Sequence, residues 1–123
     1  MTLVLLVEDN PGVRSSLREL LELDGYEVAE CPDVASSLDL INGDARIDVA
    51  MVDYWLENET AEAVLAALRT KRPDVCVLLF TGGTDEITVE TTRWLGASEG
   101  IHGFIQKPFL HKDIRELFRK FGF

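Results

Sequence analysis

Short apolar runs alternate with amphipathic helical patterns from one end of this chain to the other. Leu3–Val7, Ile47–Val52 and Val75–Phe80 are nearly continuous apolar runs, which is typical of strands covered on both faces in a parallel sheet. Tyr26–Glu30 alternates instead, and Gly103–Gln106 is short. The pattern therefore predicts a parallel sheet in which these last two strands lie at the edges.

Helix start and stop signals lie between the predicted strands. Asn10 is expected to cap a first helix with Pro11 at its first position, and Asp33 is expected to cap a second helix. Asp24-Gly25 and Asn42-Gly43 supply the corresponding stops. The expected buried stripes are Val13, Leu17, Leu20 and Leu21 in the first helix and Val34, Leu38 and Ile41 in the second.

Three further helices are predicted in the second half of the chain. One runs roughly from Glu59 to Lys71 and ends before Pro73. Another, over about residues 84–95, is rich in β-branched side chains, so we expect it to be the least stable helix. The third lies at the end of the chain. The residues expected to face the core are Ala61, Val64, Leu65 and Leu68 in the 59–71 helix and Ile114, Leu117, Phe118 and Phe121 in the last helix.

Strands alternating with helices predict a doubly wound α/β domain, because right-handed crossovers place helices on both faces of the sheet. With 123 residues the chain is expected to be a single domain over 1–123. The working site of such folds lies beyond the carboxyl ends of the strands. The residues expected there are Glu8, Asp9, Asp53, Thr81 and Lys107.

Composition narrows the classes of partner. A formal net charge of −10 disfavours direct binding of nucleic acid or of anionic lipid, and most of the excess acid is expected to serve solubility. The Leu3–Val7 run is too short for a signal peptide, and no stretch approaches a membrane span. Cys31 and Cys76 lack metal-ligand spacing, so both are expected to be structural thiols in a reduced, cytoplasmic protein.

The polar residues at three strand ends are chemically matched. If the strands lie side by side, the carboxylates of Glu8, Asp9 and Asp53 converge with the ammonium of Lys107. Clustered carboxylates need a counter-charge, and oxygen ligands of this kind suit Mg²⁺ (or Mn²⁺), which can also bridge to a phosphoryl oxygen. Asp53 is the candidate nucleophile for a phosphoryl group, and Lys107 is a point charge for one of its oxygens.

The sequence resembles the receiver domain of two-component response regulators. The resemblance covers the whole chain and rests on Glu8-Asp9, Val52-Asp53, Thr81-Gly82 and Lys107-Pro108-Phe109, in this order and each at a strand end. It implies a flavodoxin-like fold of strand order 2-1-3-4-5 with five helices. It also implies that Asp53 is the phosphoacceptor and that the Thr81 hydroxyl binds a phosphoryl oxygen.

By the same resemblance, the metal is held by Asp9, Asp53 and the backbone carbonyl of Trp55, and Glu8 acts mainly through water. Thr81 and Phe104 are expected to form a switch: phosphorylation draws Thr81 toward the phosphoryl group and Phe104 turns inward. This switch would bias the surface made by the 84–95 helix, the last strand and the last helix. A plain core or surface aromatic is the alternative for Phe104.

The resemblance further implies a histidine kinase or histidine phosphotransfer protein as donor, an unknown downstream protein as partner, and a monomer or weak phosphorylation-dependent dimer. It implies a signalling phosphoacceptor that catalyses only its own phosphorylation and dephosphorylation, with no nucleic acid bound directly and no membrane contact. No output domain is expected in this chain, so it is either a stand-alone receiver or a domain of a longer protein.

The chain departs from the family pattern beside the acceptor and near the end. Glu57 and Ala61 stand where the family usually has Pro and Gly, which makes the Trp55 carbonyl less secure as a ligand. Trp55 itself either hinders water and slows dephosphorylation or packs as a lid on the loop. The segment 97–102 is longer than usual, which either alters partner recognition or is a tolerated surface insertion.

Three other functions compete with this interpretation. A phosphatase with an Asp nucleophile would need a second Asp two residues after the first, and Asn10 and Pro11 follow Asp9 instead. A nucleotide or flavin binder would need a phosphate loop, and Glu8-Asp9 would repel phosphate there. The remaining alternative is a receiver-like interaction module that is not phosphorylated. The atypical loop after Asp53 favours this alternative, and the presence of every charged site residue disfavours it.

Overall fold

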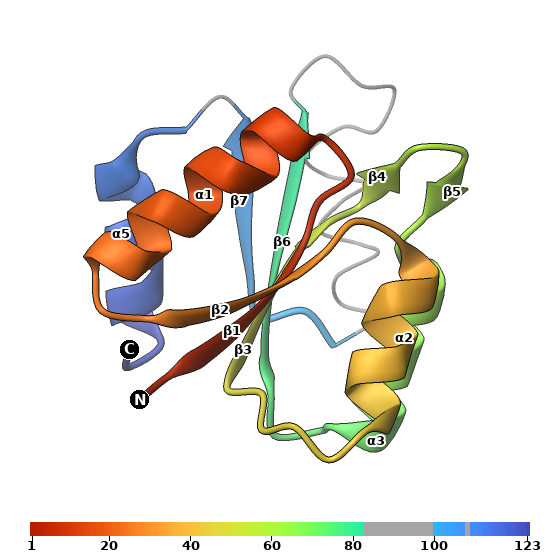
Figure 1. The fold of residues 1–123 in the computed structure, drawn as a ribbon. Coiled ribbons are helices and arrows are strands. Elements are labelled where there is room, and N and C mark those ends of the chain that lie inside the picture. Colours follow the sequence, from red (N-terminus) through yellow and green to blue (C-terminus); the bar gives the residue numbers. More distant parts are fainter. Residues whose placement is uncertain (83–99, 108) are drawn as a thin grey trace.

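One five-stranded parallel sheet forms the centre of the computed structural model, which describes residues 1–82, 100–107 and 109–123, the side chains of residues 81 and 82 excepted (Figure 1). The strands are β1 (Leu3–Val7), β2 (Glu27–Cys31), β3 (Val49–Asp53), β6 (Cys76–Gly82) and β7 (Gly103–Lys107). Their order is β2-β1-β3-β6-β7, and every neighbouring pair is parallel. The predicted doubly wound α/β fold is confirmed, with the two predicted edge strands at the edges.

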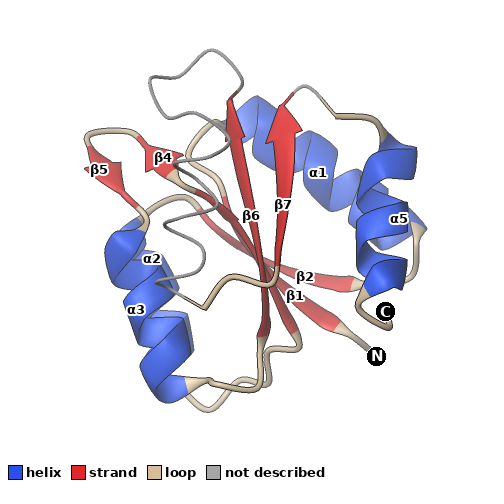
Figure 2. Ribbon diagram, turned by 180° about the vertical axis from the view of Figure 1, so that it is seen from behind, coloured by secondary structure: helices blue, strands red, loops and turns tan. Residues whose placement is uncertain are grey.

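Helices cover both faces of the sheet. The described helices are α1 (Pro11–Leu23), α2 (Val34–Asn42), α3 (Glu62–Lys71) and α5 (His111–Lys120). As Figures 1 and 2 show, α1 and α5 lie on one face and α2 and α3 on the other. Five helices were expected; the one predicted over 84–95, with its expected low stability, lies outside the described residues.

Alternate side chains of the inner strands point to opposite faces of the sheet and pack into two separate apolar cores. Leu5 and Val7 of β1 join the core under α2 and α3, whereas Val4 and Leu6 join the core under α1 and α5. β3 and β6 divide their side chains in the same way. This two-sided burial is the physical reason for the continuous apolar runs, because neither face of an inner strand meets water.

The predicted caps of the first two helices are confirmed. Asn10 Oδ1 accepts from the backbone N–H groups of Gly12 and Val13 at 2.9 and 3.1 Å. Asp33 Oδ1 accepts from the N–H of Ser36 at 2.8 Å. Each carboxamide or carboxylate satisfies backbone donors that have no partner within the helix.

The buried face of α2 differs from the prediction. Leu38 was expected to face the core, but the buried residues of α2 are Ser37 and Ile41, and Leu38 is only half-buried. The Ser37 hydroxyl donates to the Asp33 carbonyl at 2.7 Å, so this small polar residue is buried with its hydrogen bond satisfied. The helical period allows both faces, and tertiary packing selects the one that carries Ser37.

The predicted start of the third helix at Glu59 is wrong. Residues 55–60 form a small hairpin of β4 (Trp55–Leu56) and β5 (Glu59–Thr60), and α3 begins at Glu62. Asn58 occupies the turn with φ of 63°, a left-handed conformation that Asn tolerates better than most residues. The Ala61 N–H donates to the Tyr54 carbonyl at 2.9 Å and returns the chain to the end of β3 before the helix begins.

Both cysteines are buried free thiols, as expected, and burial raises the pKa of each. Among the described residues, no helix is both long enough and apolar enough to cross a lipid bilayer.

Candidate functional site

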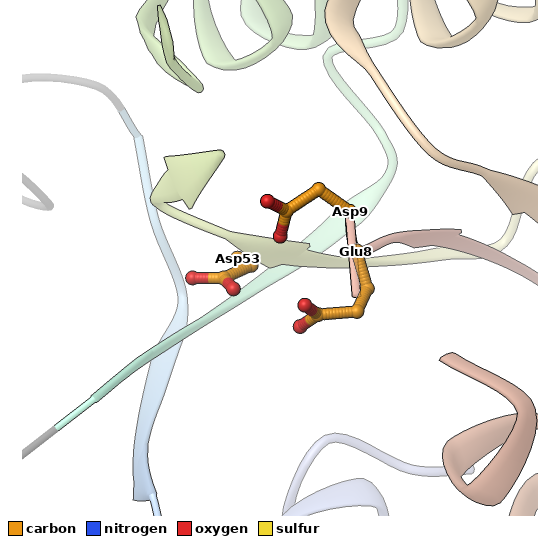
Figure 3. Close-up of side chains that lie close together, drawn as sticks. All are labelled: Glu8, Asp9 and Asp53. Carbon is orange, nitrogen blue, oxygen red and sulfur yellow. The ribbon is translucent and has the colours of Figure 1, made fainter. Parts of the chain in front are cut away.

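Three carboxylates meet at the carboxyl ends of β1 and β3 (Figure 3). Glu8 and Asp9 directly follow β1, and Asp53 is the last residue of β3. One oxygen from each side chain lies within 4.8 Å of the others. The side chains come together because β1 and β3 are parallel neighbours, with Val7 paired to Val52.

Lys107 supplies the positive charge of this cluster. It ends β7, and its Nζ lies 3.0 Å from Glu8 Oε2 and 3.0 Å from Asp53 Oδ2. The ammonium also lies 5.0 Å from the centre of the Phe80 ring and makes a cation–π contact with it. One ammonium against three carboxylates leaves the ionised cluster with excess negative charge.

Glu8 is buried and fully bonded. Its side chain is 1% exposed; Oε1 accepts from the Asn10 N–H at 3.1 Å, and Oε2 accepts from Lys107. Burial and the nearby charge of Asp53 raise the pKa of Glu8 to about 7, although the bonds from Asn10 and Lys107 favour the ionised form. Both carboxylate oxygens of Glu8 thus have protein donors, and a role of Glu8 through water stays a prediction.

Asp53 is buried as well, at 4% exposed. Its Oδ1 accepts from the Trp55 N–H at 3.2 Å, and its Oδ2 accepts from Lys107. Burial raises the pKa of Asp53, and the charge and hydrogen bond of Lys107 oppose this shift. The pKa of Lys107 is raised by its two carboxylate partners in spite of burial, so the ammonium form is favoured.

Asp9 differs from its two neighbours because it is only half-buried. In the part of the chain that the structure describes, neither of its carboxylate oxygens accepts a hydrogen bond. Asp9 thus presents ligand oxygens toward Asp53 that no protein donor occupies. An all-oxygen donor set with excess negative charge fits a hard divalent cation such as Mg²⁺ or Mn²⁺.

The remaining predicted site residues lie around this cluster. Thr81 is in β6 and pairs in register with Gln106; its side chain lies outside the described part of the chain, as does Pro108. Phe104 is half-buried on β7 and packs against the core under α2 and α3. Trp55 is 37% exposed, and its ring lies edge-on to the Tyr54 ring. The Trp55 carbonyl stays a prediction as a metal ligand.

One contact of the cluster was missed from the sequence. The Nη1 of Arg14, in the first turns of α1, donates to the backbone carbonyl of Glu8 at 2.9 Å. Its only signal in the sequence is a basic residue shortly after the predicted start of the first helix, where acidic residues are the more usual choice. Such a signal does not reveal a contact that depends on how the helix packs.

The sequence matches the profile of the response regulator receiver domain over residues 4–119. It is 31% identical over 114 residues to the transcriptional regulatory protein CpxR of Escherichia coli (strain K12), which covers 93% of this chain and 46% of that protein. It is 32% identical over 125 residues to the transcriptional regulatory protein CseB of Streptomyces coelicolor, with coverages of 98% and 51%. The chain thus spans about half the length of these curated relatives.

Solved structures support the fold. The chemotaxis protein CheY4 of Vibrio cholerae superposes with a TM-score of 0.85 at 24% identity, covering 98% of each chain. A CheY-like receiver domain protein from Methanospirillum hungatei superposes with a TM-score of 0.86 at 22% identity, covering 98% of this chain and 92% of that one.

Proposed function

The chain belongs to the response regulator receiver domain family, and on that premise we propose that it accepts a phosphoryl group on Asp53 from a phosphohistidine donor. The donor is a histidine kinase or a histidine phosphotransfer protein. The observation that carries the proposal is the position of the Lys107 ammonium, 3.0 Å from Asp53, with Asp9 facing the same carboxylate. A receiver of this kind is a signalling protein rather than an enzyme that releases a product from a separate substrate.

In the proposed step, an oxygen of Asp53 attacks the phosphorus atom of the phosphohistidine. A P–O bond to Asp53 forms while the P–N bond breaks, and the electron pair of the P–N bond stays on the imidazole nitrogen. Because the other ring nitrogen of the phosphohistidine carries a proton, the leaving group is neutral histidine. Lys107 contributes by moving from the Asp53 oxygen to an oxygen of the arriving phosphoryl group. The Thr81 hydroxyl is proposed to donate to another of these oxygens.

Asp9, Asp53 and the Trp55 carbonyl are proposed to hold Mg²⁺ (or Mn²⁺), with Glu8 acting through water. Within the described ranges, the oxygens of Asp9 accept no hydrogen bond whereas both oxygens of Glu8 do, which supports this division of roles. When bound, the cation supplies charge neutralisation between the carboxylates and the phosphoryl oxygens. The excess negative charge of the cluster, which the single ammonium of Lys107 does not neutralise, is what favours cation binding.

Reaction of the whole chain with acetyl phosphate tests the proposal. In the presence of Mg²⁺ we expect intact mass to show one added phosphoryl group, which hydroxylamine removes because an acyl phosphate is labile to it. With EDTA in place of Mg²⁺ the adduct is expected to disappear. Absence of an adduct at short times, together with no spectral change on adding beryllofluoride, would instead favour the interaction module that is not phosphorylated.

A change at the β7–α5 surface is the proposed output. Phe104, Gln106 and Leu117 line an open hollow of about 430 Å³ beside β7 and α5, which offers a surface that a partner protein can contact. In the proposal, Thr81 moves toward the phosphoryl group and Phe104 turns inward, which biases this surface toward a downstream protein.

Aromatic-ring NMR of Phe104 checks the switch. We expect the ring resonances of Phe104 to shift when beryllofluoride and Mg²⁺ are added, because the ring leaves its half-buried position. The ring of Phe118, buried in the core under α1 and α5, is the internal reference and is expected to shift little. An unchanged Phe104 ring, with Asp53 amide signals that do shift, would show that Phe104 is not part of a switch.

A further inference from the structure

Arg14 reaches the acidic cluster from α1 through a backbone atom. Its Nη1 donates to the carbonyl of Glu8 at 2.9 Å. Its Nε lies 3.7 Å from Oε1 of Glu30 on β2, and the Arg14 side chain is 20% exposed. Arg14 therefore links the first helix, the edge strand and the carboxyl end of β1 at one point.

The bond from Arg14 completes the set of bonds to Glu8. The Glu8 N–H donates to the Cys31 carbonyl at 3.1 Å, and both carboxylate oxygens of Glu8 have donors. With the carbonyl bonded to Arg14, the backbone and the side chain of Glu8 are both held. A buried residue whose polar atoms are all hydrogen-bonded is held in one orientation. This orientation also constrains the backbone of the residues next to it in the chain.

The consequence falls on Asp9. The Glu8 carbonyl belongs to the peptide that joins Glu8 to Asp9, and a peptide unit is planar. A bond that fixes the direction of this carbonyl therefore also fixes the Asp9 N–H and the position from which the Asp9 side chain leaves the backbone. Asp9 has no hydrogen bond to its own carboxylate among the described residues, so its direction depends on the backbone that carries it.

Arg14 is itself held in place. Glu30, its partner on β2, also accepts from Nη1 of Arg18 at 2.8 Å, and Arg18 Nε donates to Glu22 at 2.6 Å. The guanidinium of Arg14 is thus anchored on the side away from the cluster. A guanidinium is planar and presents several fixed donors, so it can serve Glu30 and the Glu8 carbonyl at once.

We propose that Arg14 is a positioning residue for the cation site: by holding the Glu8–Asp9 peptide, it orients the Asp9 carboxylate toward Asp53. This inference rests on the proposed function, since it assumes that Asp9 and Asp53 bind Mg²⁺. Groups that orient a metal ligand commonly change affinity although they never touch the metal.

The sign of the effect separates this role from two simpler ones. If Arg14 acted only as a positive charge beside the acidic cluster, its removal would strengthen Mg²⁺ binding, because the carboxylates would be less compensated. If Arg14 were only a structural ion pair, its removal would leave Mg²⁺ binding unchanged. Positioning predicts weaker binding.

The experiment compares Mg²⁺ binding by the parent, Arg14→Met and Arg18→Met, followed by tryptophan fluorescence. Arg18→Met is the matched control, because Arg18 shares Glu30 but makes no contact with Glu8. We expect Arg14→Met to raise the Mg²⁺ Kd roughly tenfold, the low end of what orienting groups contribute, and Arg18→Met to leave it within about twofold. Arg14→Lys keeps a positively charged donor but lacks the planar set of donors of a guanidinium, so its Mg²⁺ Kd is expected to lie between those of the parent and Arg14→Met.

A metal-free measurement completes the test. The ¹H–¹⁵N signal of the Asp9 amide is expected to shift in Arg14→Met and not in Arg18→Met. An unchanged or lower Kd in Arg14→Met, or equal weakening in both variants, would overturn the positioning role while leaving the proposed function intact. If the parent bound no Mg²⁺, the proposed function would fail instead. An Asp9 amide signal that did not shift in Arg14→Met would refute the role of Arg14 independently of Mg²⁺ binding. If Arg14→Met does not fold, Arg14→Lys carries the same comparison.

Discussion

Asp53→Asn is expected to abolish the acetyl phosphate adduct completely, while the variant folds as the parent does. The carboxamide has nearly the same shape, and its oxygen can still accept from the Trp55 N–H or from Lys107. It lacks the anionic oxygen that attacks phosphorus, so no acyl phosphate can form. Removing one of the clustered carboxylates also relieves its repulsion with Glu8, which is one cause of the raised pKa of Glu8.

Intact mass after incubation with acetyl phosphate and Mg²⁺ measures this result. Asp44→Asn is the control, because Asp44 is an exposed carboxylate in the connection between α2 and β3. The control is expected to form the adduct to the same extent as the parent. A hydroxylamine-labile adduct that persisted in Asp53→Asn would mean that another carboxylate accepts the phosphoryl group, and Asp9 would then be the first residue to test.

Glu8→Gln is expected to remove a large part of the pH dependence of stability measured without divalent cations. Glu8 has a pKa of about 7 in the folded protein against an ordinary value of 4.5, so its ionised form opposes folding. The penalty is absent at pH values well below 4.5, grows as pH rises from there to about 7, and is then constant. A shift of this size corresponds to roughly 3 kcal/mol at its full value.

Neutral Gln resembles protonated Glu8, so it does not acquire the penalty. Relative to the parent, the unfolding free energy of Glu8→Gln is therefore expected to rise by about 2 kcal/mol between pH 5 and pH 8. A hydrogen bond lost at the new amide group, worth about 1 kcal/mol, would lower both values equally and leave this difference unchanged.

Urea unfolding in EDTA at the two pH values gives the difference directly. Glu27→Gln is the control, because Glu27 is an exposed carboxylate on β2, and its stability is expected to follow the parent at both pH values. Parallel behaviour of Glu8→Gln and the parent would show that Glu8 titrates normally in the folded protein. Mg²⁺ added at pH 8 is expected to stabilise the parent, because it binds the folded state alone.

The elements that sequence reasoning located correctly have local signals. Inner strands are marked by unbroken apolar runs such as Leu3–Val7, and helix starts by cap residues such as Asn10 and Asp33. The wrong predictions concern segments whose local sequence is compatible with two structures. The helical period in α2 allows Leu38 or Ser37 to face inward, and the segment around Glu59 has a helix-like composition but forms a hairpin. Two-residue strands are too short to show any period.

The sequence by itself determined which chemistry lies at the sheet edge. Carboxylates and a lysine that directly follow parallel strands must meet there, because the carboxyl ends of such strands share one edge. Only the tertiary structure decided how the carboxylates differ. Glu8 is buried and bonded to Lys107 and Asn10, whereas the oxygens of Asp9 accept no hydrogen bond from the described part of the chain. Burial, and the reach of Arg14 to the Glu8 carbonyl, depend on how α1 and the distant strand β7 pack around β1, and no local pattern records that packing.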